Sequence, residues 1–302
     1  LNTPEGVTNI NYCNMSYGGD QSGLIWFSGA CQDVSFSHCN LSNSSSAGIY
    51  CTSNSAVFSM NSSSITGCAS YPVYAGAGAV GNISSSNSFS GNTPNNIRVV
   101  GGGTGNATWS YFAGCDYELS GWPFVTDGCE LTLEPGVTIL LDIDVKIYAD
   151  GGIYAVGTPA EPILFTSEAE TPGSEYWGCV YLNGVTETCQ FDWCTFEWGG
   201  ADIAGSYADE RALVSMNNSP NVDFTNCTFQ NSPYHGARLF SNSINDFTDC
   251  TFQNNGECGM SVEASNASPL ITDCTFTGNG TYPIATYASA VNNIMSFTAT
   301  GN

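Results

Sequence analysis

Short runs of alternating apolar and polar residues dominate this 302-residue chain, and each run ends at Asn, Asp, Ser or Gly. Val-Asp-Phe at 222–224 and Cys-Thr-Phe at 227–229 show the alternation. The pattern predicts short strands with one buried face, each followed by a turn. Helical spacing of apolar residues is nearly absent, and only 201–214 is compatible with a short helix. We therefore predict an all-β fold.

The alternating runs recur with a regular period. NCTFQN at 226–231 returns as DCTFQN at 249–254 and as DCTFTGN at 273–279, which are steps of 23 and 24 residues. A period of this length predicts a solenoid. Three short strands and three turns fit into one repeat, and stacking successive coils about 4.8 Å apart pairs their backbone groups. The whole chain then makes about a dozen coils of roughly 23 residues.

Such stacking turns equivalent side chains into ladders. We expect cysteine and phenylalanine side chains to point inward and Asn or Asp to occupy the turn before them. The inward ladder is Cys227, Cys250 and Cys274 with Phe229, Phe252 and Phe276, and the turn ladder is Asn226, Asp249 and Asp273. Stacked inward thiols are most often small core residues, although adjacent coils would also bring their Cα atoms within bridging distance.

A longer duplication overlies the short repeat. Residues 1–92 match 182–302 in order: YCNMSYGG (12–19) aligns with WCTFEWGG (193–200), and YPVYAGAGAVGNI (71–83) aligns with YPIATYASAVNNI (282–294). We therefore expect residues 1–100 to be the C-terminal part of one solenoid unit, 101–130 to be a junction, and 131–302 to be the following unit. Neither terminus has the pattern of a cap, which predicts head-to-tail contact between copies of the chain.

One segment resembles a known family. The run LTLEPGVTILLDIDVKIYADGGIYAVGTPAEPILFTS (131–167), followed by Tyr-Trp-Gly at 176–178, is similar to the segment that opens many units of secreted right-handed parallel β-helix proteins. The repeated Asn/Asp-Cys-Thr-Phe pattern resembles the coils of the same proteins. The resemblance implies a right-handed parallel β-helix, but it does not define an activity because one fold carries many functions.

Charge and cysteine content indicate the setting. Four basic residues against 27 acidic ones give a net charge of −23, which argues against binding nucleic acid or anionic membranes. The sequence contains no run of about 18 apolar residues, so it predicts no membrane span. Fourteen cysteines without zinc-site spacing favour disulfides, with Cys115 and Cys129 at the junction as the candidate pair and Cys179, Cys189 and Cys194 as further candidates. Disulfides imply an extracellular or cell-surface location.

Glycans and calcium are the ligands that the sequence leaves open. Sequons occur at Asn14, Asn40, Asn43, Asn61, Asn82, Asn106, Asn217, Asn266 and Asn279, and at Asn226 in the turn ladder, where a glycan is not expected to fit. We expect no cofactor. Calcium remains open because Asp142 and Asp144 would present two carboxylates on one strand face, although no calcium-loop motif occurs.

The sequence favours a structural role over catalysis. We predict an extracellular protein that builds a fibre or surface array by axial stacking, with copies of itself as partners and no committed catalytic residue. A polysaccharide-binding adhesin and a polysaccharide-degrading enzyme are the alternatives. For an enzyme, SPYHGARLF (232–240) resembles part of the polygalacturonase signature, with His235, Gly236 and Arg238. The neighbouring acids would be Asp223, Asp246, Asp249 and Asp273.

Overall fold

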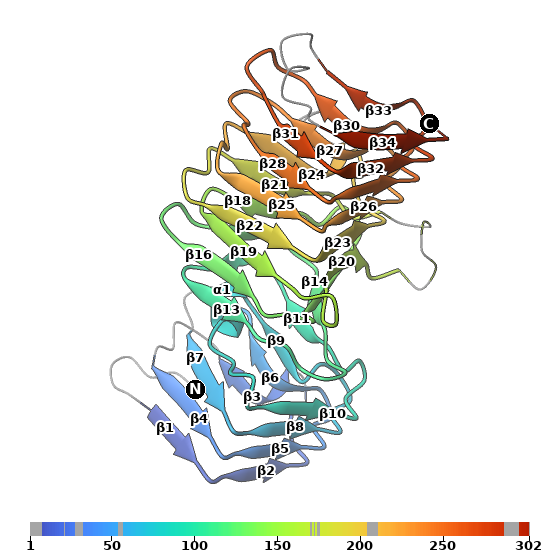
Figure 1. The fold of residues 1–302 in the computed structure, drawn as a ribbon. Helices are drawn as coiled ribbons and strands as arrows, with labels where there is room; N and C mark the ends of the chain where they lie inside the picture. The colour runs from blue at the N-terminus through green and yellow to red at the C-terminus, as the bar shows by residue number, and fades with distance from the viewer. Residues whose placement is uncertain are drawn as a thin grey trace.

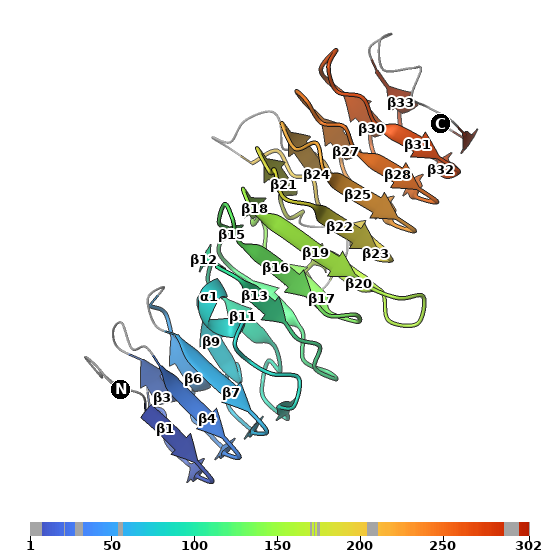
Figure 2. The ribbon, with the colours of Figure 1, turned by 60° about the vertical axis from the view of Figure 1, so that its left-hand side comes forward.

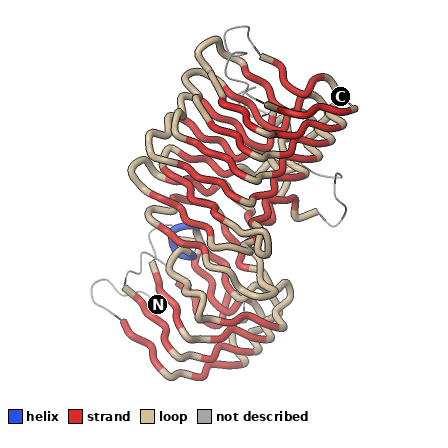
Figure 3. Tube along the Cα trace, in the orientation of Figure 1, coloured by secondary structure: helices blue, strands red, loops and turns tan. Residues whose placement is uncertain are grey.

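The protein is an elongated rod of stacked coils (Figure 1). The computed structural model describes residues 8–20, 22–27, 33–53, 57–169, 171, 173, 176–203, 211–286 and 296–301. It contains about 11 turns of about 24 residues each, close to the predicted dozen coils of 23. Almost all regular structure is strand, and the short helix α1 (Ala77–Val80) is the one helix in the described ranges (Figure 3). The all-β parallel solenoid is therefore confirmed.

The described strands form five parallel sheets. Sheet A contains β1 (Thr8–Asn11), β4 (Val34–Ser37) and β7 (Phe58–Asn61), and sheet B contains β2 (Asn14–Ser16), β5 (Asn40–Ser42), β8 (Ser64–Thr66) and β10 (Ser88–Ser90). Sheet C contains β3 (Gly23–Phe27), β6 (Ala47–Cys51), β9 (Val73–Ala75), β11 (Ile97–Val99), β14 (Tyr117–Leu119), β17 (Thr138–Leu141), β20 (Ile163–Ser167), β23 (Cys194–Glu197), β26 (Thr228–Gln230), β29 (Thr251–Gln253), β32 (Cys274–Thr277) and β34 (Phe297–Thr300).

The other two sheets begin after residue 100. Sheet D contains β12 (Gly102–Gly103), β15 (Pro123–Val125), β18 (Ile147–Ala149), β21 (Val180–Asn183), β24 (Ala212–Asn217), β27 (His235–Leu239), β30 (Cys258–Val262) and β33 (Tyr282–Ala285). Sheet E contains β13 (Ala107–Trp109), β16 (Glu130–Leu133), β19 (Gly152–Val156), β22 (Cys189–Asp192), β25 (Val222–Thr225), β28 (Asp246–Thr248) and β31 (Leu270–Thr272). Figure 2 shows the strands of sheet E side by side along the rod.

In-register pairing builds the core from columns of like side chains. Phe229 pairs with Phe252 and Phe252 with Phe276, and their ring centroids lie 4.6 and 4.7 Å apart in parallel stacks. A second column of Phe191, Phe224 and Phe247 runs along sheet E. All of these rings are fully buried. The strand spacing brings each ring onto the next, so the period in the sequence becomes continuous packing along the axis.

The corner between sheets E and C explains the turn and thiol ladders. Asn226, Asp249 and Asp273 have φ of 53°, 52° and 52°, the left-handed conformation that Asn and Asp adopt most readily among residues with a Cβ. The next residue in each coil is a buried cysteine. Cys250 Sγ lies 3.4 Å from Phe224 O and 3.3 Å from Thr248 O, so its thiol is placed to donate to a corner carbonyl. The cysteines of this ladder are free thiols.

The two sequence copies differ in phase around the axis. SFSHCNLSN (35–43) aligns with DFTNCTFQN (223–231), yet the second strand of the first motif, β5, lies in sheet B, whereas that of the second motif, β26, lies in sheet C. Sheets A and B therefore end, sheets D and E begin, and sheet C runs through. Helix α1 lies at this exchange, in contact with β7, β12 and β13. The replacement of sheets A and B by sheets D and E spans residues 77–109, which overlap the predicted junction, 101–130, in part.

Two expectations from the sequence are wrong. Cys115 and Cys129 are both free thiols. Cys115 precedes β14 of sheet C, whereas Cys129 precedes β16 of sheet E, so the two lie at different corners of the coil. No described cysteine is in a disulfide. Asp142 and Asp144 lie in a turn after β17, not on a strand, and Asp144 has φ of 60°. The stretch 201–214, which is compatible with a short helix, ends in strand β24, and its residues 204–210 lie outside the described residues, so that expectation stays a prediction.

Candidate functional site

One outward row of side chains follows sheet C along the rod. The register of the strands aligns Trp26, Tyr50, Tyr74, Arg98, Glu118, Leu140, Thr166, Glu197, Gln230, Gln253, Thr277 and Thr300. Inward-facing neighbours such as Ile25, Ile49 and Val73 are buried, as expected from the alternation of side chains along a strand. We call this line of residues the sheet C row.

The N-terminal part of the sheet C row is aromatic. Trp26 is 53% exposed. Tyr50 and Tyr74 stack with centroids 4.8 Å apart and 21° between ring planes, and Tyr71 packs edge-on against Tyr74 at 6.0 Å. Parallel in-register strands hold these rings at the coil spacing, so they form a rigid surface of ring edges and hydroxyl groups. Sequence reasoning missed this surface, although Trp26, Tyr50, Tyr74 and Arg98 are spaced by 24 residues.

The aromatic part ends at a charged cluster around Arg98. The Arg98 guanidinium donates to Glu118 and to Glu168 Oε2 at 3.1 Å, and it lies 3.6 Å from Asp142 Oδ2. Its carbon Cζ lies 5.6 Å from the centre of the Tyr71 ring, close enough for a cation–π contact. Three carboxylates thus surround one cation, so the cluster carries a negative formal charge.

The carboxylates of the cluster have different environments. Glu118 is 8% exposed and accepts hydrogen bonds from Tyr71 Oη at 2.7 Å and from Asn96 Nδ2 at 3.1 Å. Glu168 is more exposed. Burial, and then the nearby Asp142 carboxylate, raise the pKa of Glu168, and Arg98 opposes the rise. A carboxyl group with a raised pKa beside a hydrogen-bonded carboxylate is an arrangement that acid–base chemistry uses. Within the described ranges, no group of three His, Cys, Asp or Glu side chains has the arrangement of a metal site.

Beyond this cluster the row is uncharged except at Glu197. Thr166 Oγ1 donates to Glu197 Oε1 at 3.1 Å, and Gln230 Nε2 donates to Glu197 Oε2 at 2.6 Å. Gln253 Nε2 then donates to Gln230 Oε1 at 2.5 Å. These bonds link equivalent side chains of four successive coils, and Thr277 Oγ1 and Thr300 Oγ1 form a further hydroxyl pair at 3.1 Å. The row therefore continues as an ordered ladder of amide and hydroxyl groups.

The residues of the suggested polygalacturonase-like site do not come together. His235 and Arg238 lie on sheet D. Asp223 and Asp246 pair on the outer side of sheet E. Asp249 and Asp273 lie at the corner between sheets E and C. His235 is 8% exposed. Its Nδ1 accepts from Cys258 N at 3.2 Å and its Nε2 lies 3.0 Å from Glu257 Oε2.

The protonation of His235 fits a packing role. Burial, and then the nearby Arg238 guanidinium, lower the pKa of His235 to about 4. The ring is therefore neutral near pH 7, with its hydrogen on Nε2 because Nδ1 accepts a hydrogen bond. Arg238 contacts Glu263 Oε1 at 3.1 Å and the ring of Phe240. The described residues of sheet D at this level thus form an ordered polar network, and the acids that contact His235 and Arg238 in it are Glu257 and Glu263.

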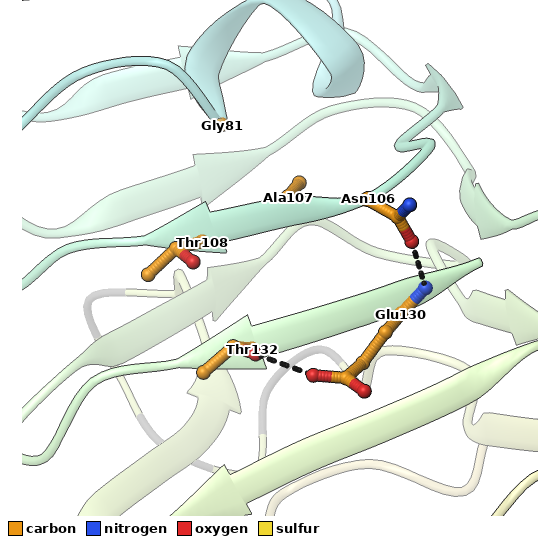
Figure 4. A pocket seen from close by; sticks show the side chains of 6 residues that line it. All are labelled: Gly81, Asn106, Ala107, Thr108, Glu130 and Thr132. Carbon is orange, nitrogen blue, oxygen red and sulfur yellow. Dashed lines mark hydrogen bonds between the residues drawn. The ribbon is translucent and has the colours of Figure 1, made fainter.

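A polar groove opens where sheet A gives way to sheet E. It has a volume of about 470 Å³ and is lined by Gly81, Asn106, Ala107, Thr108, Glu130 and Thr132 (Figure 4). Asn106 Oδ1 accepts from Glu130 N at 2.9 Å, and Thr132 Oγ1 donates to Glu130 Oε1 at 3.1 Å. These polar groups satisfy one another, and we assign the groove no function.

The sequons differ in accessibility. Those with exposed asparagines are Asn14, Asn40, Asn43, Asn61, Asn82, Asn106 and Asn266. Asn217 and Asn226 are half-buried. Asn279 is 2% exposed, and its Nδ2 donates to Phe252 O at 3.0 Å. A glycan attached to this buried Nδ2 would have no space, so the folded coil is incompatible with glycosylation there.

Comparison with known families agrees with this architecture. A family model described as a right handed beta helix region matches residues 174–302. The chain is a right-handed parallel β-helix protein. A second model, described as a pectate-lyase like beta helix domain, matches residues 103–212 of this β-helix protein and includes Glu118, Asp142 and Glu168 but not Arg98. No curated protein and no solved structure matches the chain. Among the described residues, no helix is both long and apolar enough to span a bilayer.

Proposed function

We propose that this β-helix protein binds a neutral polysaccharide along the sheet C row. The observation that carries the proposal is the aligned series Trp26, Tyr50 and Tyr74, which leads into the Arg98 cluster on one continuous sheet. Aromatic side chains combine apolar surface with polar tips, and ordered hydroxyl and amide groups can hydrogen-bond to sugar hydroxyls. A linear polymer suits a linear row, since successive sugars can meet successive coils.

The charge of the protein selects among polysaccharides. With a net charge of −23 the surface repels polyanions, and the one cation of the row, Arg98, already has three carboxylate partners. A chain of uronic acids would bring further negative charge to this cluster. The favoured ligand class is therefore neutral glycans, with an extracellular setting, where such polymers are found.

Affinity electrophoresis and calorimetry test the proposal. Soluble neutral glucans, xylans and mannans are compared with polygalacturonate. Trp26→Ala and the double variant Tyr50→Ala/Tyr74→Ala should each weaken binding to the retained neutral glycan by about tenfold, which corresponds to about 1.4 kcal/mol. Tyr282→Ala, which removes a 58% exposed aromatic from sheet D, is the matched control and should bind normally. Preferential retention by polygalacturonate, or equal affinity of all variants, would refute the proposal.

Glycosidic cleavage at the Arg98 cluster is a second candidate function. The unequal surroundings of Glu118 and Glu168 favour it, because one carboxyl group can supply a proton while the other remains an acceptor. Glu168→Gln should lower cleavage of a bound glycan by about 100-fold or more while leaving binding within about threefold. If wild-type protein binds a glycan and releases no reducing or unsaturated ends, the cluster is an ion-pair network of the binding surface.

Axial assembly into a fibre, with copies of the chain as partners, stays a prediction. Negative-stain electron microscopy of the purified protein is its direct test, and monodisperse single rods at high concentration would count against it. The binding proposal does not depend on assembly, because the sheet C row lies within one chain.

A further inference from the structure

A separate aromatic pocket lies on sheet D. It has a volume of about 400 Å³, an almost wholly apolar lining, and walls formed by Trp122, Phe124, Lys146, Tyr148 and Asp150. Phe124 and Tyr148 are partners in the register of β15 and β18, so both point outward on adjacent coils. Trp122 directly precedes β15 at the corner with sheet C. The pocket is therefore on a different sheet from the row described above.

The aromatic walls are exposed and yet ordered. Trp122 is 49% and Phe124 45% exposed, which is unusual for two neighbouring large apolar side chains. Trp122 Nε1 donates to Asp144 O at 3.1 Å, and Lys146 Nζ lies 4.4 Å from the centre of the Trp122 ring. These contacts hold the indole in place while much of its surface stays open to solvent. Such a surface indicates a binding site more than ordinary packing.

Polar groups lie at the rim of the same pocket. Tyr148 Oη accepts a hydrogen bond from Asn183 Nδ2 at 2.8 Å. Asp150 lines the same pocket as Tyr148. Burial raises the pKa of Tyr148, the hydrogen bond from Asn183 opposes the rise, and the Asp150 carboxylate adds to it. One ammonium and one carboxylate thus line the pocket, so its formal charge is zero on a strongly acidic protein.

We propose that this pocket binds a single neutral sugar ring. The C–H face of a pyranose is flat and apolar and can pack against the indole and phenyl rings, while its hydroxyl edge can donate to Asp150 and accept from Lys146. A volume of 400 Å³ lies within the range of small-molecule sites. Because the formal charge of the pocket is zero, the pocket does not favour a sugar acid or a phosphate. This site needs no ligand on the sheet C row, and together they would make the rod bivalent for a branched glycan.

Saturation-transfer difference NMR tests this inference on the whole chain. The probes are the methyl glycosides of glucose, galactose, mannose and xylose. We expect at least one to receive saturation chiefly at its ring C–H protons. Trp122→Ala should weaken that binding at least about tenfold. Asp150→Asn, which keeps the shape of the pocket, should weaken it without changing the circular dichroism spectrum.

Two further variants separate this site from the sheet C row. Trp26→Ala and Tyr282→Ala should bind the glycoside as the wild-type protein does, because both residues lie outside the pocket. The inference is overturned if none of the four glycosides binds at millimolar concentration, if folded Trp122→Ala binds normally, or if Trp26→Ala removes the signal. Loss of polymer binding in Trp26→Ala with glycoside binding intact would support both sites. Normal polymer binding by Trp26→Ala, together with loss of glycoside binding in Trp122→Ala, would support only the pocket.

Discussion

Asn255 offers the sharpest test of how the corners hold the rod together. It is 1% exposed at the corner between sheets C and D. Its Nδ2 donates to Phe229 O at 3.1 Å in the preceding coil and to Asn279 Oδ1 at 3.0 Å in the next, and its Oδ1 accepts from Ser232 N at 3.1 Å. One side chain thus links three coils.

Replacing Asn255 with alanine should destabilise the protein by about 3 kcal/mol. The substitution leaves Ser232 N without this acceptor and Phe229 O without this donor, and a buried group that loses its partner costs about 1–3 kcal/mol. Asn279 Oδ1 still accepts from the backbone of residue 255, so it adds little. The matched control is Asn266→Ala. Asn266 Nδ2 donates to Asn242 Oδ1 at 2.8 Å, but the asparagine is exposed, so its loss should cost less than about 0.5 kcal/mol.

Urea unfolding and hydrogen exchange measure the two variants. Each coil of a solenoid contacts mainly its neighbours, so faster exchange in Asn255→Ala should concentrate in 226–280 and spare 97–150. The reasoning fails if Asn255→Ala and Asn266→Ala unfold within about 0.5 kcal/mol of each other. It also fails if exchange rises equally along the rod.

Substitutions at three other positions test local electrostatics and hydrogen bonding. Cys250→Val removes a thiol that lies within reach of two corner carbonyls, and it should lower the free energy of unfolding in urea by about 1 kcal/mol. Cys250→Ser keeps a hydrogen-bond donor and should lower it less. The opposite order would contradict the role given to the thiol. The pKa of His235 is lowered from 6.5 to about 4, so the unfolded chain binds more protons between these values. Stability is therefore full above pH 6.5 and falls as the pH drops toward 4, and His235→Gln should flatten this part of a melting-temperature profile. Burial, and then the neighbouring Asp246, raise the pKa of Asp223, so its ionisation opposes folding. Asp223→Asn should consequently raise the melting temperature at pH 7 and have no such effect at pH 3, and a lower melting temperature at pH 7 would refute this assignment.

The sequence by itself determined the architecture of each coil. A period of 23 or 24 residues makes axial neighbours of equivalent positions, because parallel strands pair in register. The stacked phenylalanines, the buried thiols and the left-handed Asn or Asp turns all follow from this rule. The same rule would have found the aromatic part of the sheet C row, since Trp26, Tyr50, Tyr74 and Arg98 keep the 24-residue spacing.

Only the tertiary structure decided what lies side by side around the axis. A repeat length gives the neighbour in the next coil, but it does not say which sheet a strand joins after a short or long coil. Partners in the sheet C row step by 20 residues from Arg98 to Glu118 and by 22 from Glu118 to Leu140, so this periodic signal is lost where the charged cluster forms. The change of phase near α1, the separation of His235 from the aspartates, and the separate corners of Cys115 and Cys129 all depend on lateral placement. That placement is set by turn lengths and by packing between sheets, which the alternation of single strands does not encode.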